Sequence, residues 1–163
     1  MLKFRCILTS KPDEIDHDGE MKDSQVFWFH QDEGKKSSFT LNSSDASSPL
    51  KIDKPCHLLI DCSQTGTPWI FGGLEIQTNS RNVEVYAVPE GKDGAEYWQT
   101  HRGSREDDES LLGGNDADPC ENELYNAVIL SPSSKPESIV KLHVKLLSLR
   151  PARCTVGFVR SMK

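Results

Sequence analysis

The chain has 163 residues, of which 27% are charged and 36% are apolar, and its formal net charge at pH 7 is −6. This length favours a single domain that spans residues 1–163 and has a core of its own. The acidic balance argues against a general nucleic-acid binder, which is usually basic, without excluding one. No apolar run reaches the length of about 18 residues that a membrane-spanning helix needs. The first residues do not resemble a signal peptide, so we expect no secretory leader.

Short stretches of alternating apolar and polar residues follow one another along the chain, and they predict β-strands. In chain order we expect strands at 2–9, 25–30, 38–41, 56–62, 70–78, 82–88, 96–102, 123–131, 139–149 and 153–160. Gly72 and Gly73 predict a bulge within the fifth of them. No segment carries a clear helical period. About ten short strands separated by Pro, Gly, Ser and Asp favour an all-β fold, an antiparallel β-sandwich.

Three long polar segments interrupt the strands, and we expect mobile loops near 10–24, 42–49 and 103–122. The segment 104–121 holds seven acidic residues against one arginine, whereas 139–163 holds six lysines or arginines and no acid. Four adjacent acids at 106–109 cannot be held at a fixed separation in a dry cleft, so we interpret them as solvated or facing a partner. No catalytic residue is assigned there.

Several long patterns carry a family resemblance. After the strand at 56–62 come "GGLEIQTNSRNVEVYAV", a strand with Tyr97 and Trp98, and, late in the chain, "IVKLHVKLLSLRPARCTVGFVRS". In order and spacing these resemble the discoidin, or galactose-binding-like, superfamily, most clearly from residue 56 onward. The resemblance implies an antiparallel jelly-roll β-sandwich whose ligand surface is commonly formed by loops at one end.

Two branches of that superfamily are closest. One comprises intracellular scaffold modules, including the amino-terminal domain of a DNA single-strand-break repair scaffold. The other is the ABC-transporter-associated ATPase family called PAAT, to which segments 81–86 and 100–103 are similar. The chain has no phosphate-binding loop, because the turn at 91–94 has neither the spacing nor a helix after it.

Metal sites have weak support in the sequence. Glu14, Asp16 and Asp18 fit the first half of an EF-hand loop, but Gln25 stands where a bidentate carboxylate is required. A solvated loop is the simpler interpretation, although some discoidin-like domains hold a structural calcium, so that alternative stays open. No Cys/His spacing typical of zinc is present. We therefore expect no metal and no cofactor.

The five cysteines stand at 6, 56, 62, 120 and 154 without a Cys-x-x-Cys pair. In the absence of a secretory signal we interpret them as reduced, mostly buried thiols of a cytoplasmic protein. A nuclear or mitochondrion-associated location stays open.

Candidate binding residues fall into two groups. The segment 79–82, Asn-Ser-Arg-Asn, predicts a corner between two strands that projects Arg81 at the rim. Trp and Arg dominate interface energetics, so we expect Trp69, Arg81, Trp98 and Arg102 to bind a partner there. Lys141, His143 and Lys145 share the strand face opposite the core, a basic surface for phosphate or an acidic partner. Its alternative is a solvated face balanced by the acidic loop.

These observations predict an intracellular, non-catalytic interaction module that docks a protein partner through rim loops. The resemblance leaves two alternatives open: an ATPase-associated regulator of mitochondrial ABC transporters, and a DNA-repair scaffold domain.

Overall fold

The computed structural model describes residues 2–10, 24–31, 40–42, 50–53, 55–62, 68–105, 124–133, 135–147 and 153–162. Their strands are β1 (Leu2–Thr9), β2 (Ser24–Gln31), β3 (Thr40–Asn42), β4 (Leu50–Asp53), β5 (Cys56–Asp61), β6 (Trp69–Phe71), β7 (Gly73–Thr78), β8 (Asn82–Pro89), β9 (Glu96–Arg102), β10 (Tyr125–Leu130), β11 (Glu137–Leu147) and β12 (Arg153–Met162). Every pairing between them is antiparallel. The all-β antiparallel prediction is confirmed for this part of the chain.

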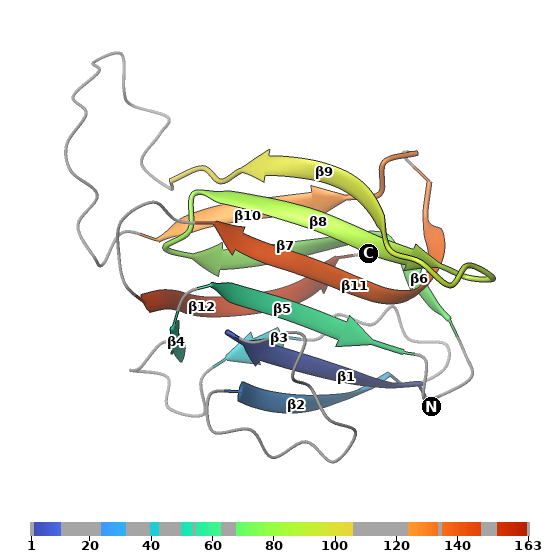
Figure 1. Ribbon diagram of the computed structural model, residues 1–163, viewed down its shortest axis with the longest axis horizontal. Coiled ribbons are helices and arrows are strands. Elements are labelled where there is room, and N and C mark those ends of the chain that lie inside the picture. The colour runs from blue at the N-terminus through green and yellow to red at the C-terminus, as the bar shows by residue number, and fades with distance from the viewer. Residues whose placement is uncertain are drawn as a thin grey trace.

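The strands form two sheets (Figure 1). In the larger sheet the order is β2-β1-β5-β11-β8-β9, and β6 also pairs with β11. In the smaller sheet the order is β10-β7-β12-β3, and β4 also pairs with β12. Neighbours in both sheets are mostly far apart in sequence, so the fold depends on contacts that no local pattern specifies.

The single strand predicted at 70–78 is divided between the two sheets. Trp69–Phe71 pairs with β11 in the larger sheet, whereas Gly73–Thr78 pairs with β10 and β12 in the smaller one. The chain changes sheet at Gly72, where the sequence predicted a bulge. Glycine suits such a bend because it has no Cβ to restrict the backbone.

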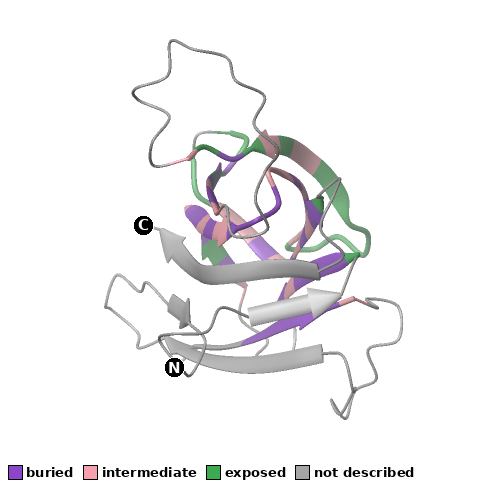
Figure 2. Ribbon diagram, turned by 90° about the vertical axis from the view of Figure 1, so that its left-hand side faces the viewer, coloured by how far each residue is buried: buried purple, intermediate pink, exposed green. Residues whose placement is uncertain are grey.

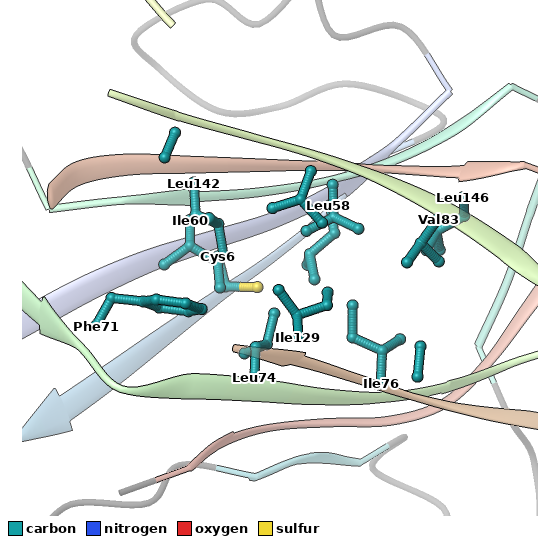
Figure 3. Close-up of a cluster of buried hydrophobic side chains, with 14 of the residues drawn as sticks. Cys6, Leu58, Ile60, Phe71, Leu74, Ile76, Val83, Ile129, Leu142 and Leu146 are labelled. Carbon is teal, nitrogen blue, oxygen red and sulfur yellow. The ribbon is translucent and has the colours of Figure 1, made fainter. Parts of the chain in front are cut away.

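Side chains from both sheets meet in one hydrophobic cluster. Figure 3 shows Leu58, Ile60, Leu142, Val83 and Leu146 of the larger sheet near Leu74, Ile76 and Ile129 of the smaller one. Along β8 and β10, buried positions alternate with half-buried or exposed ones. Figure 2 shows buried, half-buried and exposed positions following one another along the strands that it colours. This period of two is what a strand with one face on a core produces.

The predicted loops lie mostly outside the described residues, which omit 11–23, 43–49 and 106–123. Residues 103–105, at the start of the third predicted loop, are described. Gly103 is buried, and Ser104 forms a β-bridge with Asn126. In the described part of the chain, no helix has the length and apolar character that crossing a membrane requires.

Candidate functional site

The corner between β7 and β8 is built by short polar side chains. Thr78, Asn79 and Ser80 are all buried, and the Ser80 amide donates a hydrogen bond of 3.2 Å to Thr78 Oγ1. A hydroxyl that bonds a backbone amide two residues later is a common way to hold a turn. The segment 79–82 therefore forms a corner, as predicted, and Arg81 follows it directly.

The end of β9 ties this corner to the smaller sheet. The Gly103 amide donates to the Arg81 carbonyl at 2.6 Å. Ser104 and Asn126 exchange two backbone hydrogen bonds, of 2.9 and 2.7 Å. The chain leaving the edge strand of one sheet thus pairs with the edge strand of the other. We call the residues gathered here, Arg81, Arg102, Gly103, Arg105 and Tyr125, the arginine corner.

Two guanidinium groups of the arginine corner share one aromatic ring. Cζ of Arg81 lies 5.6 Å and Cζ of Arg105 lies 5.4 Å from the centre of the Tyr125 ring. Arg105 Nη2 also donates to the Tyr125 hydroxyl at 3.3 Å. The ring is buried, so cation–π attraction helps to hold both cations at this end of the molecule.

The Arg81 side chain has a buried nitrogen that makes no hydrogen bond. Its side chain is half-buried, its Nε is fully buried, and this nitrogen has no hydrogen-bond partner. Among the described residues, no carboxylate forms an ion pair with Arg81. A buried donor without an acceptor costs about 1–3 kcal/mol, more when charged. Because no described carboxylate neutralises the Arg81 guanidinium, an anionic group from a partner could pair with its terminal nitrogens.

A second unsatisfied atom lies on the residue next to Tyr125. Asn126 Oδ1 is buried and has no hydrogen-bond partner. Arg102, at the end of β9 opposite Asn82, is exposed. Of the four predicted rim residues, the structure brings Arg81 and Arg102 to this corner.

The two predicted tryptophan anchors lie elsewhere. Trp69 is 6% exposed and belongs to the hydrophobic core, so its assignment to the surface is wrong. Trp98 is half-buried and packs against that core. Phe71 lies between them, with ring centroids 5.0 Å from Trp69 and 5.4 Å from Trp98. Trp69 and Phe71 lie on one face of β6 and are buried, whereas Ile70 lies on the other face and is exposed. This alternation could have indicated that Trp69 belongs to the core, but the sequence interpretation missed it.

The predicted basic face of β11 is largely neutralised by its own sheet. Lys141 lies 3.7 Å from Asp61 of β5, and Lys145 lies 3.9 Å from Glu84 of β8. The Lys145 ammonium is also 4.6 Å from the centre of the Tyr86 ring. The counter-charges therefore come from adjacent strands, whereas the sequence interpretation sought them in the acidic loop. This arrangement weakens the case for phosphate binding on this face.

A histidine pair on the same face has no counterpart in the sequence interpretation. His57 Nδ1 and His143 Nε2 are 2.9 Å apart, although 86 positions separate the two residues. No role was predicted for His57, and His143 was predicted only as part of the basic face. Because β5 and β11 pair through long-range topology, no local pattern places these two rings together.

The calcium candidates Glu14, Asp16 and Asp18 lie outside the described residues. Within the described part of the chain, no three His, Cys, Asp or Glu side chains are grouped as metal ligands. Cys6, Cys56 and Cys62 are buried and are not joined in disulfides. Burial raises the pKa of Cys6 and raises that of Cys62 to about 12, with the Asp61 charge adding to the second shift. These thiols are therefore weak nucleophiles.

A comparison of the chain with models of known protein families gave no match, and a search of curated proteins gave none either.

Proposed function

We propose that the chain is an intracellular, non-catalytic interaction module that docks a protein partner through the arginine corner. Its fold in this proposal is an antiparallel jelly-roll β-sandwich of the galactose-binding-like type. The presence of two antiparallel sheets and a cluster that draws on both supports that architecture. Loops and corners at one end of such a scaffold are where binding residues concentrate.

The unsatisfied Arg81 side chain is the observation that carries the proposal. A guanidinium presents a planar fork of donors that matches a carboxylate or a phosphate. In Arg81 the fork is held against Tyr125, and its Nε is buried without an acceptor. The partner is therefore expected to bring an acidic side chain to this corner. Arg105, on the same ring, adds positive charge for the same group.

The test begins with capture of partners by proximity labelling, followed by affinity measurements between the purified domain and the purified partner. A buried anchor contributes roughly 2 kcal/mol or more, so Arg81→Ala should weaken binding by about 30-fold. Arg81→Lys keeps the charge but not the fork, and we expect it to recover only part of the affinity.

Two controls bracket this result. Lys92→Ala removes an exposed lysine from the β8–β9 turn, where it pairs with Glu96, and should leave affinity unchanged. Deletion of 106–118 removes the adjacent acids 106–109, which the sequence predicts to be solvated. It should weaken association mainly at low salt, since solvated charges steer more than they anchor. Normal binding by a folded Arg81→Ala variant would refute the proposal, as would loss of the partner through the deletion alone.

An enzyme assay separates this proposal from the PAAT alternative. The purified domain should not turn over ATP at the order of 1 per second, the low end of the usual enzyme range. A turnover of that size, lost on substitution of a single residue, would replace the interaction module with a catalytic one.

A further inference from the structure

The side chains of His57 and His143 meet on the outer face of the larger sheet. Their ring centroids are 5.1 Å apart with an interplanar angle of 39°, and the facing nitrogens are 2.9 Å apart. A hydrogen bond between two imidazole nitrogens needs one donor and one acceptor. At least one of the two nitrogens therefore presents a lone pair to the other ring.

The backbone fixes the spacing of this pair. His57 lies opposite Lys145 and His143 lies opposite Leu59 in the β5–β11 ladder, so the two histidines are diagonal neighbours. Both strands are interior to the sheet, β5 between β1 and β11, and β11 between β5 and β8. Strands paired on both sides move little, so the two rings start from a fixed separation.

That separation matches the requirement of a chelated metal. Imidazole nitrogens bind transition metals at about 2.0–2.1 Å. Two such nitrogens at octahedral or tetrahedral angles around one ion lie about 2.9–3.4 Å apart. The observed 2.9 Å is at the short end of this range. A metal ion would lie off the line that joins the two nitrogens, so the rings would have to turn about their Cβ–Cγ bonds until both lone pairs point at it.

We propose that His57 and His143 form a two-nitrogen chelate for a divalent transition metal of the type that prefers imidazole, such as Ni²⁺ or Zn²⁺. Among the described residues, no third His, Cys, Asp or Glu side chain joins the pair. His57 is buried and His143 is half-buried, so an ion would approach the pair from the His143 side.

The surrounding charges permit a cation at this place. Lys141 and Lys145 flank His143 on its own strand, but Asp61 and Glu84 pair with them from the two adjacent strands. The Tyr86 ring, 5.9 Å from His143, covers part of the site from β8. This proposal is independent of the arginine corner, which lies at the β7–β8 turn and the ends of β9 and β10.

The first test uses the unmodified protein. Titration calorimetry at neutral pH should show one Ni²⁺ bound per chain, weaker binding of Co²⁺ in keeping with the usual order of affinities, and no binding of Mg²⁺. Paramagnetic broadening of amide resonances by Ni²⁺ should be strongest around His57 and His143. Absence of binding at millimolar Ni²⁺, or broadening centred elsewhere in the chain, would overturn the proposal.

The second test uses variants with a matched control. His57→Gln and His143→Gln should each lower Ni²⁺ affinity at least about tenfold, because loss of a supporting group around a metal already costs that much. His101→Gln removes a half-buried histidine from β9 and should leave affinity unchanged. If both substitutions in the pair leave the affinity intact, the proposal fails. If a variant does not fold, the broadening map of the unmodified protein decides the question.

Discussion

Gly103 and Tyr125 are in such close contact that a methyl group on the Gly103 α-carbon would come within 2.9 Å of Tyr125 Cβ. The same methyl group would lie 3.4 Å from the carbonyl oxygens of Arg81 and Asn126. The close packing between the end of β9 and the start of β10 therefore requires a residue without a side chain at position 103. It also positions the ring that both corner arginines contact.

Gly103→Ala should destabilise the fold by about 1–3 kcal/mol, the usual cost of forcing extra volume into a packed site. The atoms in the way are a Cβ and two backbone oxygens, none of which is the end of a flexible side chain. Urea unfolding of the two proteins measures the difference. Gly94→Ala is the control, because nothing lies within 4 Å of its added Cβ, and its change should stay within about 0.5 kcal/mol.

Trp69→Ala should destabilise the protein by about 3–5 kcal/mol, the range for a large aromatic removed from a core. The buried ring packs edge-on against Phe71 and lies in the main hydrophobic cluster. Arg102→Ala, at an exposed position, should change stability by no more than about 0.5 kcal/mol. Chemical denaturation followed by circular dichroism compares the two variants. Tryptophan fluorescence gives a second measurement for Arg102→Ala. Equal effects of the two changes would contradict the placement of Trp69.

The buried thiols should make the fold less stable in alkali. Burial raises the pKa of Cys6 and of Cys62 above the ordinary value of 9.0, and the pKa of Cys62 reaches about 12. Above pH 9 the folded state therefore keeps thiol protons that the unfolded state loses. The contribution of these thiols to the free energy of unfolding is complete below about pH 9. It falls as pH rises toward 12, by about 1.4 kcal/mol per thiol for each pH unit. Urea unfolding at pH 7.5 and pH 10.5 measures this loss.

Other groups ionise in the same range, so a variant is required for that experiment. The double change Cys6→Val with Cys62→Val removes both thiols and should show a shallower decline between the two pH values. An unchanged decline would mean that these cysteines do not titrate as described. Slow modification of Cys6, Cys56 and Cys62 by thiol reagents at neutral pH is expected from the same burial.

The ion pair between Lys141 and Asp61 should contribute little to stability. The Lys141 side chain is 52% exposed, and the charged atoms are 3.7 Å apart. Exposed pairs typically contribute about 0–1 kcal/mol. A double-mutant cycle with Lys141→Gln and Asp61→Asn measures the coupling, which should fall further in high salt. A coupling above about 2 kcal/mol would show that this face is less solvated than the exposure indicates.

Local periodicity located most strands but not their limits or their partners. The strands at 2–9 and 96–102 have the predicted bounds, whereas β4 was not predicted and the segment 70–78 is divided. In β11 the face opposite Lys141, His143 and Lys145 would include Val140 if the alternation were regular, yet Ile139 is buried and Val140 is half-buried. A register shift between Ile139 and Lys141 reverses the parity there, and it arises from pairing with β8.

The candidate sites divide in the same way. Asn79 and Ser80 form a corner because their short polar side chains suit turns wherever they occur, so the sequence alone determined that feature and the position of Arg81 beside it. Local alternation likewise determined that Lys141, His143 and Lys145 share a face. Only the tertiary structure decided that Arg81 and Arg105 share the Tyr125 ring, that Asp61 and Glu84 neutralise the lysines, and that His57 meets His143. Each of these contacts joins residues that lie far apart in the chain. The strand register that brings them together is set where one face of each sheet is buried in a common core, a property of the whole fold.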